Sequence, residues 1–386
     1  MNPWEKLEIL GAAASYDHSC TGTGLSPEAP LTLEGRRRLP GIYLAQTASG
    51  RRLPLLKVLF TNRCRHRCAY CVNRAENEIP RAAFEPRELA EVALELFRRG
   101  LIKGVFLSSA VEGSAEGTME RLLAAAKLLR NAGFRGYLHL KILPGAAPEQ
   151  VREAVRLATR VSANLEFARE KTLKRLAPGK EKRRLVAALA LAREAALEAG
   201  KTPSLTTQVI VGAGPETDYD LLRLAQNLYR NGLLSRMYFS AYLPVNPDPR
   251  LPPPESPPPL RRERRLYQAD YLLRLYGFRY EELLSPGENL PLHEDPKLFW
   301  ARRHPEFFPV EVSRASYEEL LRVPGIGPRL ARRIIEARRR SILTWEGLKR
   351  AGVPLERAAP FITLYGRRRE RQLAFYFSSS AKVSHT

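Results

Sequence analysis

Between residues 53 and 245 the sequence alternates short apolar runs with helical patterns. Runs rich in apolar, β-branched or aromatic residues lie at 53–61, 104–110, 136–143, 160–167, 205–212 and 236–245. Helical spacing of apolar residues fills the gaps, at 86–99, 116–132, 148–159, 181–199 and 217–231. Strands separated by helices form parallel sheets with right-handed crossovers. Six such units predict an α/β fold, an open partial (β/α)6 barrel rather than a closed barrel of eight units.

The rest of the chain is expected to flank this barrel, which we place at 53–245. A proline-rich segment, "LPVNPDPRLPPPESPPPL", begins at residue 243. Proline interrupts sheets and helices and favours an extended chain, so the segment is either a linker or a strap across the barrel mouth. The other predicted parts are an N-terminal extension (1–52), the strap or linker with a helical region (246–308), a small all-α module (309–366) and a basic tail (367–386).

Three of the four cysteines stand together directly after the first apolar run, in "LFTNRCRHRCAYCVNR". Cys64, Cys68 and Cys71 have the spacing C-x3-C-x2-C. Small secreted domains disperse many cysteines along the chain, whereas this chain is long enough to bury a large core without disulfides. The first residues lack the order of a signal peptide, and no apolar run approaches a membrane span of about 18 residues. We therefore expect a cytoplasmic protein that does not associate with a membrane. Its clustered thiols are expected to bind a metal or to act in redox chemistry.

Two kinds of metal site are compatible with three thiolates. They can hold three irons of a four-iron, four-sulfur cluster and leave the fourth iron open to a small chelating ligand. They can also bind zinc if a fourth ligand is supplied, for which His66, His18 and Cys20 are candidates. Zinc ribbons usually pair two C-x2-C knuckles, and this sequence has no second knuckle. The spacing therefore favours the iron–sulfur cluster.

The cysteine motif, with Tyr70 before the last cysteine, resembles the radical S-adenosylmethionine (SAM) superfamily. The resemblance implies a partial barrel in which Cys64, Cys68 and Cys71 hold a [4Fe–4S] cluster. It also implies that SAM chelates the open iron and is cleaved by an electron from the cluster. The product is a 5′-deoxyadenosyl radical, which takes hydrogen from a substrate. An electron donor such as a flavodoxin or ferredoxin is then required, and Tyr70 is expected near the adenine.

The resemblance extends to the ends of other strands. "VGAGPETDYDLLRL" is similar to a family stretch that supports the adenine, although Gly214 and Pro215 are swapped relative to that pattern. The remaining SAM contacts are implied at Ser108 and Ser109 for the amino group, at Asn164 and Glu166 for the ribose hydroxyls or sulfonium, and at Ile210 or Val211 for the adenine. Glu166 could instead pair with an arginine inside the barrel. The same two interpretations stay open for His139 and Lys141.

Cys20, in "SYDHSCTGTG", is the cysteine outside the cluster motif. One interpretation is a buried or incidental thiol. In the other, the polar loop reaches the barrel mouth, where Cys20 donates a hydrogen atom or binds substrate as a catalytic residue. One spare cysteine is too few to hold a second cluster of the same kind.

The second specific motif is "SYEELLRVPGIGPRLARRIIEARRR" at 316–340. It predicts a helix ending at Leu321, a tight turn, and a second helix from about Pro328. Glycine in such a turn lets backbone amides approach a phosphate, and a helix N-terminus favours an anion. The stretch resembles the helix-hairpin-helix motif of DNA repair and DNA-binding proteins. That resemblance assigns nucleic-acid contacts to Gly325, Ile326, Gly327, Arg329, Arg332 and Arg333.

The charge balance supports a polyanionic partner. Lys and Arg number 63 against 41 acidic residues, a net charge of +22. Each phosphate that such residues neutralise releases counterions. The excess could also be the solvated surface of an arginine-rich, heat-adapted protein, and the hairpin module could bind a protein. A following stretch, "ILTWEGLKRAGVPLERAAPFI", is predicted to form a degenerate second hairpin that packs on the first.

Taken together, the chain most resembles radical SAM proteins assigned to DNA modification or repair. The predicted function is therefore radical chemistry on a nucleic acid, with duplex DNA favoured over RNA or tRNA. A non-catalytic nucleic-acid-binding protein with a structural metal site is the main alternative. A radical SAM enzyme for a small molecule or a protein is another.

Overall fold

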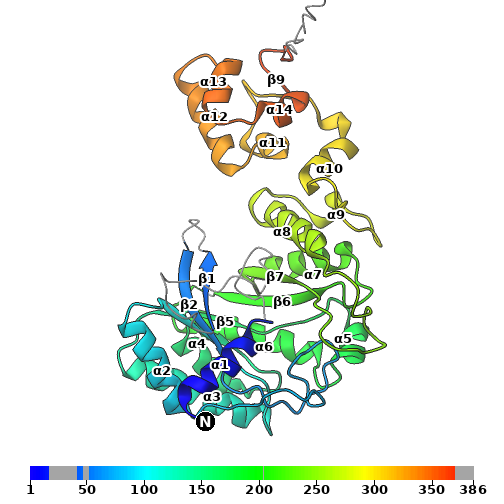
Figure 1. Cartoon of the computed structure of the whole chain (residues 1–386). Coiled ribbons are helices and arrows are strands. Elements are labelled where there is room, and N and C mark those ends of the chain that lie inside the picture. The colour runs from blue at the N-terminus through cyan, green and yellow to red at the C-terminus, as the bar shows by residue number, and fades with distance from the viewer. Residues whose placement is uncertain (17–40, 47–51, 203, 370–386) are drawn as a thin grey trace, which may run out of the picture. The chain divides into compact units, whose positions relative to one another are not determined.

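The computed structural model describes residues 1–16, 41–46, 52–202 and 204–369. They form two compact units, drawn in chain order from blue to red in Figure 1. We call Met1–Leu273 with Arg279–Pro296 the barrel unit, and Arg274–Phe278 with Lys297–Thr386 the C-terminal unit. Each unit has its own apolar core.

The barrel unit is built on a seven-stranded sheet in which neighbours in space are also neighbours in the chain. Strands β2 to β7 run parallel, and β1 pairs antiparallel with β2. The strands are β1 (Ile42–Gln46), β2 (Arg52–Leu59), β3 (Gly104–Ser108), β4 (Tyr137–Lys141), β5 (Arg160–Ser162), β6 (Leu205–Val211) and β7 (Arg236–Ala241). The predicted partial (β/α)6 barrel is confirmed. The edge strand β1 was not predicted, because five residues are too short a pattern to separate from a loop.

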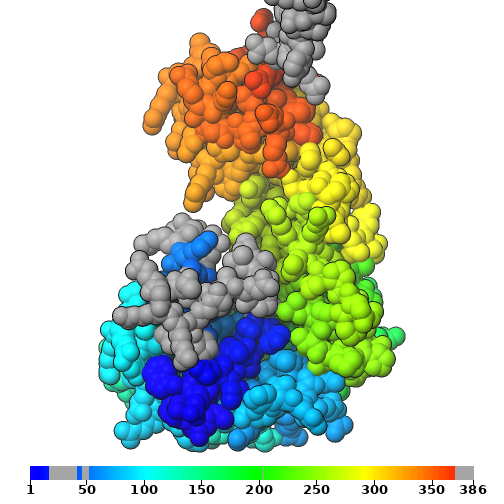
Figure 2. All heavy atoms as spheres, viewed as in Figure 1, coloured from blue at the N-terminus to red at the C-terminus, as the bar shows by residue number. Residues whose placement is uncertain are grey.

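Helices cover the outer face of this sheet (Figure 1). They are α1 (Pro3–Ala14), α2 (Pro86–Arg98), α3 (Ala115–Asn131), α4 (Pro148–Leu157), α5 (Glu170–Leu176), α6 (Lys182–Glu198), α7 (Asp218–Arg230), α8 (Leu260–Leu275) and α9 (Tyr280–Leu283). Helices α2, α3, α4 and α6 contact one another in this order, as the outer layer of a partial barrel does. Helix α1 packs on β2 and α2, and its other face lies at the surface (Figure 2).

Local sequence explains where these helices begin and end. In α2, Pro86 occupies the first turn and Glu88 closes a capping box with the residue before the helix. Six apolar residues of α2 are buried on one face. Gly100 follows with a φ of 73°, the left-handed conformation that ends many helices.

Side chains from the neighbouring helix α8 satisfy the backbone of β7 at the open edge of the sheet. The Tyr267 hydroxyl donates to the carbonyl of Phe239 at 2.8 Å and accepts the N–H of the same residue at 3.2 Å. Glu263 accepts the N–H of Ala241 at 2.9 Å. These groups of β7 would otherwise offer pairing positions to a further strand. The sheet can therefore end at β7 without closing into a full barrel.

The barrel unit buries apolar residues between sheet and helices and polar residues at one end. Its largest fully buried side chains include Phe60, Phe84, Phe106, Phe134, Phe167 and Phe239. By contrast, buried polar side chains gather at the carboxyl ends of the strands: Ser108, Asn164, Glu166, Gln208 and Ser240. Buried polar groups cost free energy unless they have partners. This end of the barrel is therefore where a ligand site is expected.

The C-terminal unit is a small helical domain closed by two short parallel strands. Its elements are α10 (Pro296–Arg303), the 3-10 helix η1 (Pro305–Phe307), β8 (Val310–Glu311), α11 (Tyr317–Arg322), α12 (Pro328–Arg340), α13 (Trp345–Arg350), α14 (Leu355–Ala358), the 3-10 helix η2 (Ala359–Phe361) and β9 (Ile362–Thr363). The β8–β9 pair joins the two ends of the helical region, an addition to the all-α module predicted from sequence.

Candidate functional site

The cysteine loop (residues 62–77) follows β2 and forms one wall of an open cavity at the carboxyl ends of the strands. Cys64, Cys68 and Cys71 are unpaired thiols that all line this cavity. Cys68 is 5% exposed, and the other two are partly exposed. The loop turns tightly, since the N–H of Cys71 donates to the carbonyl of Cys68 at 3.0 Å. Three thiols therefore converge on one cavity.

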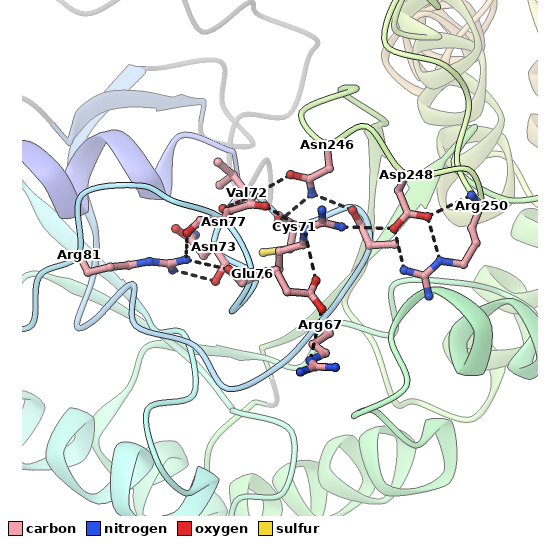
Figure 3. Close-up of polar contacts among 12 residues, drawn as sticks. Arg67, Cys71, Val72, Asn73, Glu76, Asn77, Arg81, Asn246, Asp248 and Arg250 are labelled. Atoms are coloured by element: carbon pink, nitrogen blue, oxygen red, sulfur yellow. Dashed lines mark hydrogen bonds and ion pairs between the residues drawn. The ribbon is translucent and has the colours of Figure 1, made fainter.

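The proline-rich segment after β7 holds this loop in place (Figure 3). The side-chain amide of Asn246 donates to the carbonyls of Ala69 and Cys71 at 2.7 and 3.0 Å. It also accepts a hydrogen bond of 2.7 Å from Asn77, which itself donates to the carbonyl of Val72. Of the two predicted interpretations, linker or strap, these contacts favour the strap.

Arginines complete the support of the loop (Figure 3). The Arg81 guanidinium donates to four backbone carbonyls, those of Asn62, Asn73, Arg74 and Asn77, at 2.5 to 3.0 Å. Asp248 in the strap accepts from Arg74 at 3.2 Å and from Arg250 at 2.7 Å. Buried carbonyls need donors, and here the donors come from side chains rather than from a regular ladder. The cysteine loop is thus a fixed structure although it lacks regular secondary structure.

Two of the three thiols, those of Cys68 and Cys71, resist ionisation while no positive centre is bound. Burial and the neighbouring Cys68 raise the pKa of Cys71 to about 12. Burial also raises the pKa of Cys68. A metal or cluster requires thiolates, so its binding would release protons from these groups and offset their burial.

Tyr70, Glu166 and Lys180 form a polar cluster beside the thiols. The Lys180 ammonium lies 2.6 Å from a Glu166 carboxylate oxygen and 3.2 Å from the Tyr70 hydroxyl. The Tyr70 ring also packs edge-on against Phe167, with centroids 5.5 Å apart. Of the two interpretations of Glu166, ion pairing is present, but its partner is a lysine rather than an arginine. Because all three side chains of the cluster line the cavity, this pairing is part of the candidate site.

The other predicted SAM contacts occupy different positions around the cavity. Ser108, Ser109, Asn164 and Ile210 line it. Val211, one residue further along β6, is fully buried and is not among the lining residues, because successive side chains of a strand point to opposite faces. Lys141 lines the cavity as well. His139 instead lies inside the barrel, stacked on Phe106 and hydrogen-bonded to Ser162.

Several buried polar atoms of the cavity lack hydrogen-bond partners among the described residues. They are His66 Nε2, Asn73 Oδ1, Ser109 Oγ, Asn164 Oδ1 and the Tyr242 hydroxyl. Buried polar atoms without partners are rare in native proteins, and each requires an explanation. A polar ligand in the cavity would supply the partners.

Among the lining residues that sequence analysis did not single out are Lys180, Gln208 and Tyr242. Gln208 and Tyr242 lie within the predicted runs 205–212 and 236–245, so the rule that sites lie toward the carboxyl ends of the strands could have found them. Lys180 follows α5 in a turn whose sequence carries no distinctive signal.

Two candidate residues, His18 and Cys20, lie outside the described residues, so their predicted roles remain predictions. The same holds for most of the basic tail, which is described only to residue 369. In the described ranges, no group of three or more His, Cys, Asp and Glu side chains is arranged around a single metal position. A four-iron cluster spreads its ligands around a larger body than one ion does.

The hairpin residues form a compact turn in the C-terminal unit. Gly325 has a φ of 87°, a conformation that favours glycine. Ile326 is buried, and its carbonyl accepts a hydrogen bond of 2.5 Å from Lys297. Gly327 is the N-cap of α12, whose first turn has no side-chain cap. The turn therefore presents backbone amides at the start of a helix.

The predicted arginines follow this turn on α12. Arg329, Arg332 and Arg333 are all exposed. Arg332 also packs over the Tyr317 ring, and Arg333 donates to the carbonyl of Ala351 at 2.6 Å. The start of α12 thus combines backbone amides with positive side chains.

The degenerate second hairpin packs on the first as predicted. Gly352 in its turn has a φ of 92° and lies beside Leu330 and Arg333 of α12. Reciprocally, Gly325 of the first turn lies beside Pro354 and Arg357 of the second hairpin. The two turns therefore brace each other.

Family models match the chain over both the cysteine loop and the hairpin turn. Residues 58–228 match the family model of the radical SAM superfamily. This stretch runs from β2 into α7, so the barrel unit has the fold of the radical SAM superfamily. Residues 310–337 match the model of the helix-hairpin-helix motif. Radical SAM enzymes bind a [4Fe–4S] cluster and SAM, and the three cavity thiols and the unpartnered polar atoms fit these groups.

Several solved structures have folds similar to part of this chain. HydG, a maturase of the [FeFe]-hydrogenase, is 14% identical with a TM-score of 0.45, over 56% of this chain and 48% of its own. Methylornithine synthase (PylB) is 13% identical with a TM-score of 0.42, over 49% and 53%. A radical SAM methyltransferase from Sphaerobacter thermophilus is 16% identical with a TM-score of 0.41, over 63% and 76%. The chain thus spans about half the length of the first two. No curated protein matches it at a significant level.

Helices of membrane-spanning length and apolarity are absent from the described ranges of the chain.

Proposed function

We propose that this protein is a radical SAM enzyme that acts on a nucleic acid, with duplex DNA favoured and RNA as the alternative. The observation that carries the proposal is the combination of two matched features in one chain, a radical SAM barrel and a helix-hairpin-helix motif. The net charge of +22 supports a polyanionic substrate. DNA modification and DNA repair are both compatible with these features.

In the barrel, the thiolates of Cys64, Cys68 and Cys71 would hold the cluster. Ser109 and Asn164 have unpartnered polar atoms that could bind SAM, and Ile210 adds an apolar surface. When bound, the reduced cluster and SAM supply a carbon-centred radical that removes hydrogen from the substrate. The strap and Arg81 hold the cysteine loop in place and so fix the positions of the thiols. Tyr70 and Phe167 add aromatic surface beside them.

In the C-terminal unit, the hairpin would hold the phosphate backbone. Backbone amides at the start of α12 and the exposed Arg329 are suited to phosphate oxygens. Such contacts position a nucleic acid but do not read its sequence. A target inside a duplex would have to leave the base stack to meet the radical.

The proposal is tested by anaerobic turnover. The protein is reconstituted with iron and sulfide, reduced, and mixed with SAM alone, with a mixed-sequence DNA duplex, or with the matching RNA duplex. Release of 5′-deoxyadenosine that rises with one polymer supports the proposal and names the substrate type. Release that neither polymer changes contradicts a nucleic-acid substrate and points to a small molecule or a protein.

A cysteine variant tests the enzyme class separately. Cys68→Ala must abolish 5′-deoxyadenosine release, and retained release would refute the ligand assignment. One zinc per chain without sulfide in the wild-type protein would support a non-catalytic protein with a structural metal site. A flavodoxin or ferredoxin is the proposed physiological electron donor, and it can replace the chemical reductant in the same assay.

A further inference from the structure

Lys180 reaches the cavity from a turn that is attached to the cysteine loop. The turn follows α5, and the N–H of Lys180 donates to the carbonyl of Ala177 at 2.9 Å. The N–H of Ala69 in the cysteine loop donates to the carbonyl of Leu176 at 2.8 Å. Gly179 packs so closely on His66 that an added Cβ would lie 2.2 Å from its Nδ1. The position of Lys180 beside the thiols is therefore set by direct packing.

The side chain of Lys180 is held as a buried ammonium. Only 14% of it is exposed, and Glu166 and Tyr70 both contact its nitrogen. Burial disfavours the charged form, but the Glu166 carboxylate outweighs burial, and the pKa of Lys180 lies above its ordinary value. The positive charge is thus permanent at physiological pH, and it lies where solvent screening is weak.

Glu166, which makes this contact, has an uncommon backbone conformation. Its φ is 62°, which non-glycine residues rarely adopt. Its N–H donates to the carbonyl of Gln208 at 3.0 Å, and its own carbonyl accepts from Ile210 at 2.7 Å. The pairing with β6 therefore maintains a strained residue, and such strain gathers at functional sites.

We propose that Lys180 sets the reduction potential of the cluster held by Cys64, Cys68 and Cys71, and that Glu166 and Tyr70 position its ammonium. Reduction adds an electron to a group already surrounded by thiolates. A fixed positive charge nearby stabilises the more negative, reduced state and raises the potential, whereas the Glu166 carboxylate partly opposes it. The inference rests on the proposed cluster site, and it assigns to Lys180 a role that does not require contact with SAM.

The test is a potentiometric titration of the reconstituted cluster in the absence of SAM. Electron paramagnetic resonance monitors the reduced cluster at each potential. Lys180→Met removes the charge and nearly keeps the length of the side chain. We expect the equilibrium constant for one-electron reduction to fall at least tenfold, a shift of 59 mV to more negative potential. Lys174→Met is the matched control, because Lys174 lies on α5 with its side chain 68% exposed. Its potential should equal that of the wild type.

Glu166→Gln should shift the reduction potential of the cluster in the opposite direction. It also provides a second test in case Lys180→Met does not assemble a cluster. It removes a negative charge beside the cluster, so its potential should become more positive. If Lys180→Met does not assemble a cluster, a wild-type potential in Glu166→Gln overturns the inference. A wild-type potential in Lys180→Met with weakened SAM binding also overturns it, because Lys180 would then serve the SAM carboxylate. Iron and sulfide analysis of each sample separates these outcomes from failure of the proposed function, in which the wild type holds no cluster.

Discussion

Asn246→Ala should loosen the cysteine loop without altering a cysteine. The Asn246 side chain makes three hydrogen bonds in a residue that is only 2% exposed. The substitution leaves the carbonyls of Ala69 and Cys71 without these donors, while Asn77 keeps its bond to Val72. Each buried carbonyl left unpaired costs about 1–3 kcal/mol. We therefore expect the free energy of unfolding of the barrel unit to fall by about 2–6 kcal/mol.

Two measurements check this prediction. Urea unfolding of the metal-free protein, followed by circular dichroism, gives the change in stability. Loss of iron to a chelator from the reconstituted protein should be faster in Asn246→Ala, because the loop that carries the ligands is less well held. Asn231→Ala is the matched control, since Asn231 is exposed and donates only to the carbonyl of Asn227 in its own helix among the bonds described. Equal unfolding midpoints and equal iron loss in Asn246→Ala and the control would refute the reasoning.

Three further predictions concern pH dependence, nucleic-acid binding and the hairpin turn. Burial raises the pKa of Glu263 to about 7, so the folded state binds the proton more tightly than the unfolded state does. Relative to Glu263→Gln, the free energy of unfolding of the wild type should therefore fall by up to about 3 kcal/mol as pH rises from about 4.5 to about 7. Urea unfolding at each pH measures this difference, and parallel pH profiles of the two proteins would contradict the prediction. Replacing Arg329 and Arg332 together with alanine should weaken binding to a DNA duplex. The slope of the logarithm of the binding constant against the logarithm of salt concentration should become shallower by about 0.9 for each phosphate that the variant no longer neutralises. Replacing the exposed Arg183 of α6 should leave that slope unchanged. Gly325→Ala should destabilise the C-terminal unit by about 1–2 kcal/mol, because the left-handed φ of 87° disfavours a side chain. An added Cβ would also lie 2.9 Å from Pro354. A thermal melt detects the loss, and unchanged iron content would show that the barrel is intact.

Local patterns in the sequence were enough to predict the architecture of the barrel. The alternation from 53 to 245 predicted six parallel strands, and all six are present in the expected order. The cysteine motif was placed at the carboxyl end of the first of them, together with Ser109, Asn164 and Ile210 from other strands. This worked because parallel strands end at a common edge, so residues just after each apolar run converge whatever their separation in the chain. The hairpin was predictable for a similar reason, since its turn and helix start are encoded within a few residues.

Only the tertiary structure determined which residues hold the cysteine loop in place and which charged side chain lies beside it. Asn246 contacts Ala69 across 177 positions in the chain, and Lys180 contacts Tyr70 across 110. No periodicity relates such residues, because their meeting depends on how the strap and the turn after α5 pack on the cysteine loop. The lysine partner of Glu166 and the burial of Val211 away from the cavity were likewise settled by packing. The sequence by itself thus determined the strands, the cluster motif and the hairpin, which are local. The electrostatics and rigidity of the site arise from contacts between distant segments, and only the folded chain brings these segments together.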